Sequence, residues 1–411
     1  MNQPRKTIIF LADGMADEPV AEIGGKTPLQ AARTPGMDFI ARNGRSGTLL
    51  TLPEGFPTSS DVANMSVLGC DLKTEFCGRA VLEAMSQGIA LGPHDVAFRC
   101  NLVTIGDDGR LLDYSGGHIS QAAATELIEY LNEHLATERI RFHPGVSYRN
   151  LLILSGAEFS PKVHCEKPDD HPGGAVADFL PRLASGAEEG RATLDVILDV
   201  MARAAELLPK APANVRAVAE GRKPANGIWL WSPGRAGSMR TLAQRHGITG
   251  AVISAVDVVN GLGRSLGMDV VKVPGATGYI DTNYEGKAAA AIKAIQTHDL
   301  VYLHVEAIDE VSHHRDLALK IQAIEDFDSK IVCPVLRACG DGVTHAVLPD
   351  HPVPISMGRH TRTPVPVAVC GPGFEPDDVQ AFDELAAPRG ALGALFGAEF
   401  MQLLYPGDES K

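Results

Sequence analysis

The sequence predicts an α/β protein, built on a doubly wound, mostly parallel sheet that carries a smaller inserted α/β domain. Two observations support this. Apolar runs typical of buried strands alternate with helical segments near both ends of the chain. In the middle of the chain, the expected strands and helices are separated by loops rich in glycine and proline. The length of 411 residues, with 45% hydrophobic and 21% charged residues, is sufficient for two domains with large cores.

The first elements follow one another closely. Residues 6–12 (KTIIFLA) form an apolar run that ends at Asp13, which predicts a buried first strand. Thr34, which is followed by proline, predicts a helix start with Thr34 as its N-cap. Residues 46–52 predict another strand, and residues 57–61 (PTSSD) predict the start of a second helix.

The same alternation returns toward the C-terminus. Residues 299–306 (DLVYLHVE) predict a buried strand, and residues 316–339 predict one long amphipathic helix. Two short apolar runs, 345–348 and 365–370, predict further strands. Because strands and helices alternate in both outer segments, we expect these segments to pair into a single domain.

The middle of the chain mixes strands and helices with loops rich in glycine and proline. The expected strands are 96–105, 148–156 and 226–232, and the expected helices are 118–135 and 192–208. We therefore expect a discontinuous domain of residues 1–95 and 247–411, with an inserted domain of residues 96–246.

Charge and cysteine content narrow the classes of partner. The formal charge of −14 argues against nucleic acid and anionic membranes as main partners. The longest apolar runs fall short of a membrane span, and the N-terminal run is too short for a signal peptide. Seven scattered cysteines without a C-x-x-C pair are typical of reduced thiols, so we expect a cytoplasmic protein. The sequence leaves the oligomeric state open.

Six carboxylate and imidazole side chains follow the expected strands. Asp13 ends the first strand, Asp309 and His313 lie four residues apart, and Asp350 adjoins His351, with His360 nine residues later. Ligands bind beyond the carboxyl ends of strands in open α/β sheets. Oxygen and nitrogen donors of this kind suit Mn²⁺, Zn²⁺ or Mg²⁺, and paired ions can clamp a phosphoryl group. The spacing therefore predicts a site for two divalent metal ions.

Five segments carry a resemblance to a known family. They read PTSSDVANMSVLGCD (57–71), CGRAVLEAMSQGIAL (77–91), DYSGGHIS (113–120), EAIDEVSHH (306–314) and LPDHPVPISMGRHT (348–361). Together they resemble the archaeal-type 2,3-bisphosphoglycerate-independent phosphoglycerate mutases of the alkaline phosphatase superfamily. The matches span nearly the whole chain in the family's order. The resemblance implies an alkaline phosphatase-like sheet domain with an inserted substrate-binding domain.

The resemblance also implies roles for individual residues. One metal ion, commonly Mn²⁺, would be held by Asp309, His313 and His360. The other would be held by Asp13, Ser60, Asp350 and His351. Ser60 would be the nucleophile, since the family's serine precedes an acidic residue, with Ser59 as the alternative. A serine at a helix N-terminus is well placed for this role, because the helix dipole favours the alkoxide and the phosphoserine.

The implied reaction interconverts 3-phosphoglycerate and 2-phosphoglycerate through a phosphoserine, without 2,3-bisphosphoglycerate, in glycolysis and gluconeogenesis. His118 matches the family's active-site histidine and is the candidate acid and base. Family members also bind the substrate through arginines, whose planar guanidinium suits carboxylate and phosphate groups. The candidates in this chain are Arg99, Arg149, Arg222 and Arg235.

Two positions depart from the family pattern and leave alternatives open. Many relatives have histidine at the position of Asn64, and several have lysine near Asn260. These departures put the mutase activity in doubt. A phosphotransferase on another hydroxy acid such as homoserine and a phosphomonoesterase on the same site are the alternative enzymes. A non-catalytic metal-binding protein is the alternative of a different class.

Overall fold

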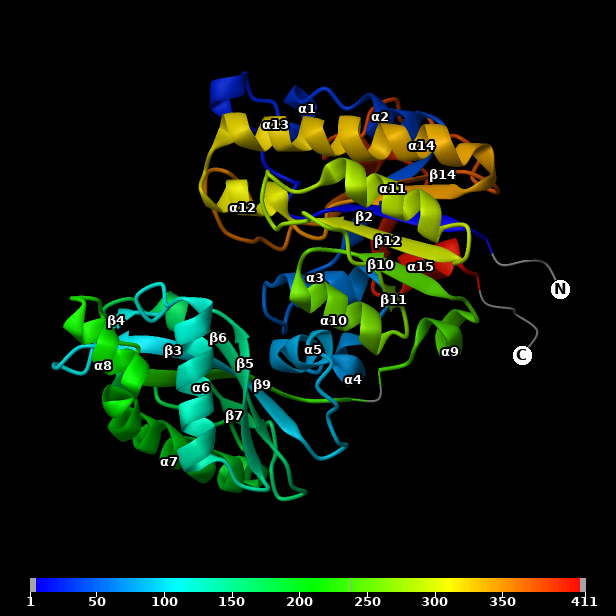
Figure 1. Ribbon diagram of the computed structural model, residues 1–411. Helices are drawn as coiled ribbons and strands as arrows, with labels where there is room; N and C mark the ends of the chain where they lie inside the picture. The colour runs from blue at the N-terminus through cyan, green and yellow to red at the C-terminus, as the bar shows by residue number, and fades with distance from the viewer. Residues whose placement is uncertain (1–4, 238, 407–411) are drawn as a thin grey trace. The chain divides into compact units, whose positions relative to one another are not determined.

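The computed structural model describes residues 5–237 and 239–406 (Figure 1). The chain divides into two compact units, one of Met1–Phe76 with Met239–Lys411 and one of Cys77–Ser238. Both bounds lie earlier in the chain than the predicted domain boundaries at 95/96 and 246/247. Helix α5 (Arg79–Ser86) packs on the strands of the second unit. The first bound therefore lies before this helix, closer to the N-terminus than expected. Arg245 donates to the Gly69 carbonyl oxygen at 2.6 Å, which ties residues before 247 to the first unit.

The first unit is built on an eight-stranded sheet in the described part of the chain. In spatial order its strands are β11 (Asp269–Val270), β10 (Gly250–Ile253), β12 (Leu300–Val305), β1 (Thr7–Ala12), β13 (Thr344–Leu348), β14 (Val365–Cys370), β2 (Gly44–Leu50) and β15 (Gly393–Phe396). The first five run parallel, β14 is antiparallel to both neighbours, and β15 is parallel to β2. The prediction of a mostly parallel sheet in an α/β fold is confirmed.

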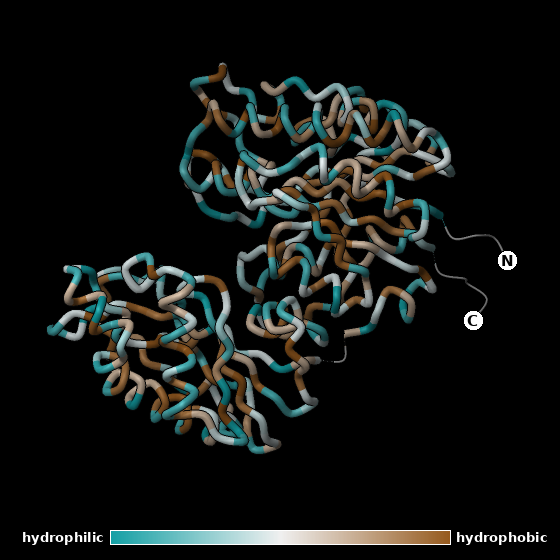
Figure 2. The backbone as a smooth tube through the Cα atoms, in the orientation of Figure 1, coloured by the Kyte–Doolittle hydropathy of each residue, from teal (hydrophilic) through white to brown (hydrophobic). Residues whose placement is uncertain are grey.

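Helices cover both faces of this sheet (Figure 1). They are α1 (Pro28–Ala31), α2 (Pro35–Arg42), α3 (Ser60–Val67), α4 (Leu72–Glu75), α9 (Leu242–His246), α10 (Asp257–Ser265), α11 (Tyr284–Ala294), α12 (Ala307–His313), α13 (Leu317–Phe327), α14 (Cys333–Cys339) and α15 (Glu399–Leu404). The central strands β1, β12 and β13 are buried along their whole length. This explains their unbroken apolar sequences, since such strands have no solvent face. Figure 2 shows the same concentration of apolar residues along the strands.

The long helix expected at 316–339 is interrupted. A π-helical turn, Asp328–Val332, separates α13 from α14. The Asp328 carboxylate accepts hydrogen bonds from the backbone N–H groups of Gly36 (3.0 Å) and Met37 (2.7 Å) at the start of α2. The Thr34 side chain makes no capping bond. The Asp328 carboxylate therefore caps the N-terminus of α2, the role expected of the Thr34 side chain. Sequence spacing does not reveal a contact between residues so far apart.

The second unit contains an antiparallel sheet of β4 (Leu111–Asp113), β3 (Val96–Ile105), β6 (Arg149–Leu154) and β5 (Ile140–Val146), with β9 (Gly227–Arg235) paired to β3. A small ribbon joins β7 (Val163–His164) to β8 (Arg182–Leu183). Helices α6 (Gln121–Leu135), α7 (Arg191–Leu207) and α8 (Pro212–Ala219) share its core. None of the helices in the two described ranges combines the length and apolar character that a membrane crossing requires.

Candidate functional site: a metal centre with a serine at a helix N-terminus

Three neighbouring parallel strands end at the same edge of the sheet. Asp13 directly follows β1, Asp309 lies on the helix after β12, and Asp350 and His351 follow β13. Gly14 allows the close approach of these segments, because its φ is +66° and an added Cβ would lie 2.6 Å from the Asp309 Cα. The sheet therefore brings together ligand-type side chains that are hundreds of residues apart in sequence.

The first cluster consists of Asp13, Asp350 and His351, all fully buried. The His351 Nε2 lies 3.3 Å from Asp13 Oδ1 and 3.5 Å from Asp350 Oδ2. The backbone N–H of Gly14 donates to Asp350 Oδ1 at 3.2 Å, which fixes that carboxylate. The Ser60 Oγ completes the group at 3.1 Å from His351 Nε2. Four potential donor atoms thus face one small volume.

The second cluster surrounds Asp309. Its carboxylate oxygens lie 3.2 Å from His313 Nε2 and 3.4 Å from His360 Nε2. The two imidazole nitrogens are 3.0 Å apart. The rings of His351 and His360 stack with their centroids 3.7 Å apart, so the two clusters adjoin. All seven residues expected to hold metal therefore lie together in one unit.

The chemistry of these residues fits divalent cations. The oxygens Asp13 Oδ1 and Asp309 Oδ1 are buried without a hydrogen-bond partner among the described residues, and an unsatisfied buried carboxylate oxygen is costly. Burial and then the neighbouring Asp350 raise the pKa of Asp13 well above its usual value. Burial raises the pKa of Asp350 to about 7. A bound cation would favour the ionised carboxylates and use the orphaned oxygens as ligands.

Ser60 begins helix α3 and is half-buried, whereas Ser59 precedes the helix and its side chain makes no capping bond. Asn64 lies one turn further along. Its Nδ2 donates to Asp350 Oδ2 at 2.9 Å, and its Oδ1 accepts from the Tyr302 hydroxyl at 2.6 Å. The asparagine that departs from the family pattern therefore connects the serine helix to a carboxylate of the first cluster.

His304 and Glu306 belong to the site, and sequence reasoning missed both. His304 Nε2 lies 2.9 Å from Asp13 Oδ2, and its Nδ1 lies 3.1 Å from the Ser254 Oγ. Glu306 Oε2 is 3.7 Å from the same Nε2. The available signal was a polar side chain, His304, inside an otherwise apolar run, with a second one, Glu306, just after that run.

The second departure, Asn260, makes no hydrogen bond to a ligand atom among the described residues. Its Nδ2 donates to the Ser254 carbonyl oxygen at 3.2 Å, and Ser254 and His304 link it to Asp13. A different lysine lies nearby: Lys287 is fully buried, and its Nζ donates to the His304 carbonyl oxygen at 3.1 Å. Burial lowers the pKa of Lys287 to about 8.

His118 lies in the second unit, in a strained turn before α6. Its φ is +54°, a left-handed conformation that is uncommon for residues other than glycine. The residue is exposed. The backbone N–H of His118 donates to Ser115 Oγ at 3.1 Å, and Ser115 in turn donates to Asp113. A turn held in this way is typical of a functional position.

The four candidate arginines differ in what they contact within the second unit. Arg99 is buried, pairs with Glu83 at 2.8 Å and stacks over Trp231. Arg222 pairs with the carboxylate of Glu220. Two of the four candidates are therefore already charge-compensated.

The other two candidates have no carboxylate in ion-pair range among the described residues. Arg149 is exposed over the Tyr148 ring. Arg235 donates to the Phe159 carbonyl oxygen. The Ser147 hydroxyl donates to the Ile119 carbonyl oxygen at 2.7 Å, which places the turns that carry Arg149 and His118 side by side.

Comparison with known proteins gives one family. The family described as 2,3-bisphosphoglycerate-independent phosphoglycerate mutase matches residues 41–214. A protein of that name from Methanosarcina acetivorans is 47% identical over 403 residues, covering 97% of this chain and 99% of its own. A protein from Geobacter sulfurreducens, named as a probable member, is 45% identical over 405 residues, with coverage of 97% and 99%.

Two solved structures have a fold similar to that of this chain. A structure from Pyrococcus horikoshii superposes with a TM-score of 0.83 at 26% identity and covers 99% of both chains. The cofactor-independent phosphoglycerate mutase from Thermoplasma acidophilum superposes with a TM-score of 0.67 at 28% identity, covering 97% of this chain and 98% of its own.

Proposed function

The chain belongs to the 2,3-bisphosphoglycerate-independent phosphoglycerate mutase family and interconverts 3-phosphoglycerate and 2-phosphoglycerate, and we propose that Ser60 carries the phosphoryl group between the two positions. The observation that carries this proposal is the position of the Ser60 Oγ, 3.1 Å from His351 Nε2 at the edge of the metal cluster. In the described part of the chain, no other hydroxyl lies within hydrogen-bonding distance of the ligand atoms of this cluster.

The enzyme uses divalent metal ions, and the ligand sets are proposed here. Asp309, His313 and His360 would hold one ion, and Asp13, Asp350 and His351 with Ser60 would hold the other. When bound, the two ions lower the pKa of the serine hydroxyl and offset the charge of the transferring phosphoryl group. We propose Mn²⁺ as the ion, with Zn²⁺ or Mg²⁺ as alternatives, because aspartate and histidine ligands accept all three.

The reaction has two balanced halves. In the first, Ser60 Oγ forms a bond to phosphorus while the bond from phosphorus to O3 of the substrate breaks. Ser60 loses its proton, and the departing O3 gains one, which gives phosphoserine and glycerate. In the second, O2 of glycerate attacks the phosphoserine and loses its proton, and Ser60 Oγ regains one. The product is 2-phosphoglycerate.

The second unit would bind glycerate and move the protons. We assign His118 as the acid and base, supported by its strained, exposed turn. Arg149 is the preferred carboxylate or phosphate ligand, since its charge has no acidic partner among the described residues and its turn adjoins that of His118. Arg235 is second, and Arg99 and Arg222 are last because glutamates already compensate them. A cytoplasmic location is consistent with this function and stays a prediction.

The departures from the family pattern do not argue for another enzyme. Asn64 is hydrogen-bonded into the cluster, and Asn260 reaches it only through other residues. Relatives that match 97% of the chain carry the mutase name, one of them as a probable member. A phosphatase would release free phosphate, and a kinase-like phosphotransferase would need a separate donor.

One assay separates these outcomes. The manganese-loaded protein is incubated with 3-phosphoglycerate in the absence of 2,3-bisphosphoglycerate, and 2-phosphoglycerate is followed by coupling to enolase. Free phosphate is measured in the same samples. We expect product that disappears after chelation with EDTA and returns with Mn²⁺, while phosphate stays constant. Accumulating phosphate, or a requirement for a second phosphorylated substrate, contradicts the mutase mechanism.

A further inference from the structure

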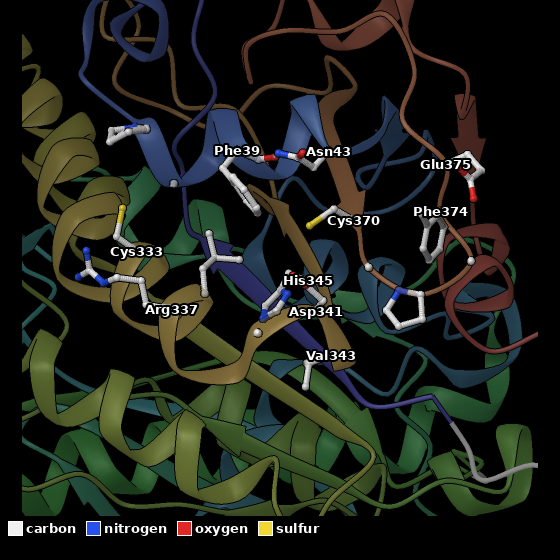
Figure 3. Close-up of a pocket in the computed structure, with 17 residues that line it drawn as sticks. Phe39, Asn43, Cys333, Arg337, Asp341, Val343, His345, Cys370, Phe374 and Glu375 are labelled. Carbon is white, nitrogen blue, oxygen red and sulfur yellow. The ribbon is translucent and has the colours of Figure 1, made fainter.

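A cavity lies within the first unit, at the end of the sheet opposite the cluster of metal-type side chains (Figure 3). Its volume is about 690 Å³, within the range of small-molecule sites in proteins. His345, the second residue of β13, borders the cavity, whereas Asp350 and His351 follow the last residue of the same strand. The cavity is therefore separate from the catalytic cluster and is not used by the reaction.

Aromatic side chains border this cavity. Phe39 lies on α2 and is 44% exposed, which is high for a large apolar side chain beside a cavity. Phe374, in the loop after β14, is another lining residue, and the guanidinium of Arg5 lies 4.8 Å from its ring centre. An exposed aromatic side chain at the mouth of a cavity offers a face on which a planar ring can stack.

A buried polar group also borders the cavity. His345 is only 3% exposed, and its Nε2 has no hydrogen-bond partner among the described residues. The ring stacks on Phe10 with centroids 6.0 Å apart, which fixes its orientation. Burial lowers the pKa of His345 to about 4, so the imidazole is neutral near pH 7. Buried polar atoms in proteins normally have a hydrogen-bond partner, so this nitrogen is available to a hydrogen-bonding ligand.

A cation other than Arg5 also lines the cavity. Arg337 on α14 is exposed, and no carboxylate in the described ranges comes within ion-pair distance of it. Asp341 and Glu375 also border the cavity, and Figure 3 shows Glu375 on the side opposite Arg337. Asp341 is close enough to His345 to act on its pKa, and Arg5 lies at Phe374. Among the charged residues that line the cavity, Arg337 is the one suited to bind an anion.

We propose that this cavity binds a planar aromatic molecule that carries a carboxylate or phosphate group. The ring lies against Phe39 and hydrogen-bonds the Nε2 of His345 through its edge, and the anionic group pairs with Arg337. A nucleotide and an aromatic acid share this chemistry, and the experiment distinguishes them.

The test uses the full-length, manganese-loaded protein with saturating 3-phosphoglycerate, so that the catalytic cluster is occupied. The probes are adenosine 5′-monophosphate and indole-3-acetate, followed by saturation-transfer NMR and titration calorimetry. Adenosine and inorganic phosphate serve as fragments that lack the anion or the ring. We expect at least one anionic aromatic probe to bind, with at least about tenfold higher affinity than either fragment. The tighter of the two probes identifies the source of the ligand.

Variants assign the site. Phe39→Ala and Arg337→Ala change exposed side chains, so both proteins fold, and each lowers the affinity of the bound probe at least about tenfold. Arg264→Ala, another exposed arginine of the same unit, leaves it unchanged. His345→Leu lowers it as well, and its result is used only if its melting temperature matches that of the parent. The proposal is overturned if neither anionic probe binds, if adenosine binds as tightly, or if both exposed variants bind normally.

Discussion

The hydroxyl oxygen of Ser60 lies 3.1 Å from Nε2 of His351. This contact joins the N-terminus of α3 to the residues that follow β13, two segments that are 291 positions apart in sequence. The helix supplies backbone N–H groups and a positive dipole end, and the strand end supplies the carboxylate and imidazole ligands. The proposed nucleophile and the proposed metal ligands are therefore positioned by different elements of the first unit, a helix and the end of a strand.

Replacing Ser60 by alanine is expected to lower kcat at least about a thousandfold, since the hydroxyl that accepts the phosphoryl group is removed. Ser59→Ala is the matched control and is expected to change kcat less than tenfold. The enolase-coupled assay measures both. Loss of activity in the Ser59 variant with retention in the Ser60 variant would move the nucleophile to Ser59.

Asn64→Ala is expected to weaken metal binding by about 10- to 100-fold, because residues that hydrogen-bond metal ligands orient them. Asn64 donates to Asp350 Oδ2 at 2.9 Å, whereas Asn260 contacts no ligand directly. Asn260→Ala is therefore the control, with an expected change of less than threefold. Calorimetric titration of the chelated protein with Mn²⁺ measures both constants. Equal losses would mean that the asparagines act on stability and not on the ligand.

Sequence patterns predicted five of the eight described strands of the main sheet and the metal-type side chains, because buried strands are continuously apolar and their polar ends stand out. The patterns missed β10, β11 and β15, which are short. His304 escaped notice because it lies inside such a strand, and its role depends on Asp13, from a neighbouring strand. Asp328 was equally hidden, since its partners are backbone groups of α2. Contacts of this kind depend on tertiary packing that no local pattern encodes.

The buried ion pair between Lys320 and Asp17 is expected to stabilise the loop after His351. The Lys320 Nζ lies 2.8 Å from Asp17 Oδ2 and donates to the Val353 carbonyl oxygen at 2.9 Å. Lys320→Met leaves a buried carboxylate unpaired and should lower the free energy of unfolding by about 3–5 kcal/mol. The control Lys330→Met breaks the partly exposed ion pair with Asp326 and should cost only about 1 kcal/mol. Urea unfolding checks both, and similar values for the two variants would contradict the expectation.

Acid is expected to destabilise the protein through His345. Its folded pKa is lowered to about 4, below the ordinary value of 6.5, so the unfolded chain binds the extra proton first. The stability that depends on the neutral imidazole is complete above pH 6.5 and is lost as the pH falls toward 4. The loss is on the order of 3 kcal/mol. Urea unfolding of the chelated protein and of His345→Leu at pH 7, 5.5 and 4 measures it, and parallel curves would refute this assignment.

Arg149 and Arg222 give a matched pair for substrate binding. Both are exposed in the second unit. Arg222 is paired with Glu220, whereas the guanidinium of Arg149 contacts the Tyr148 ring and hydroxyl and has no acidic partner among the described residues. An uncompensated guanidinium is free to bind a carboxylate or phosphate. Arg149→Ala is therefore expected to raise KM for 3-phosphoglycerate at least tenfold, and Arg222→Ala less than threefold. Arg149→Lys should bind 3-phosphoglycerate more tightly than Arg149→Ala but less tightly than the parent protein, since lysine lacks the bidentate geometry of arginine. If Arg222→Ala has the larger effect on KM, the ion pair with Glu220 opens on substrate binding and the two roles are exchanged.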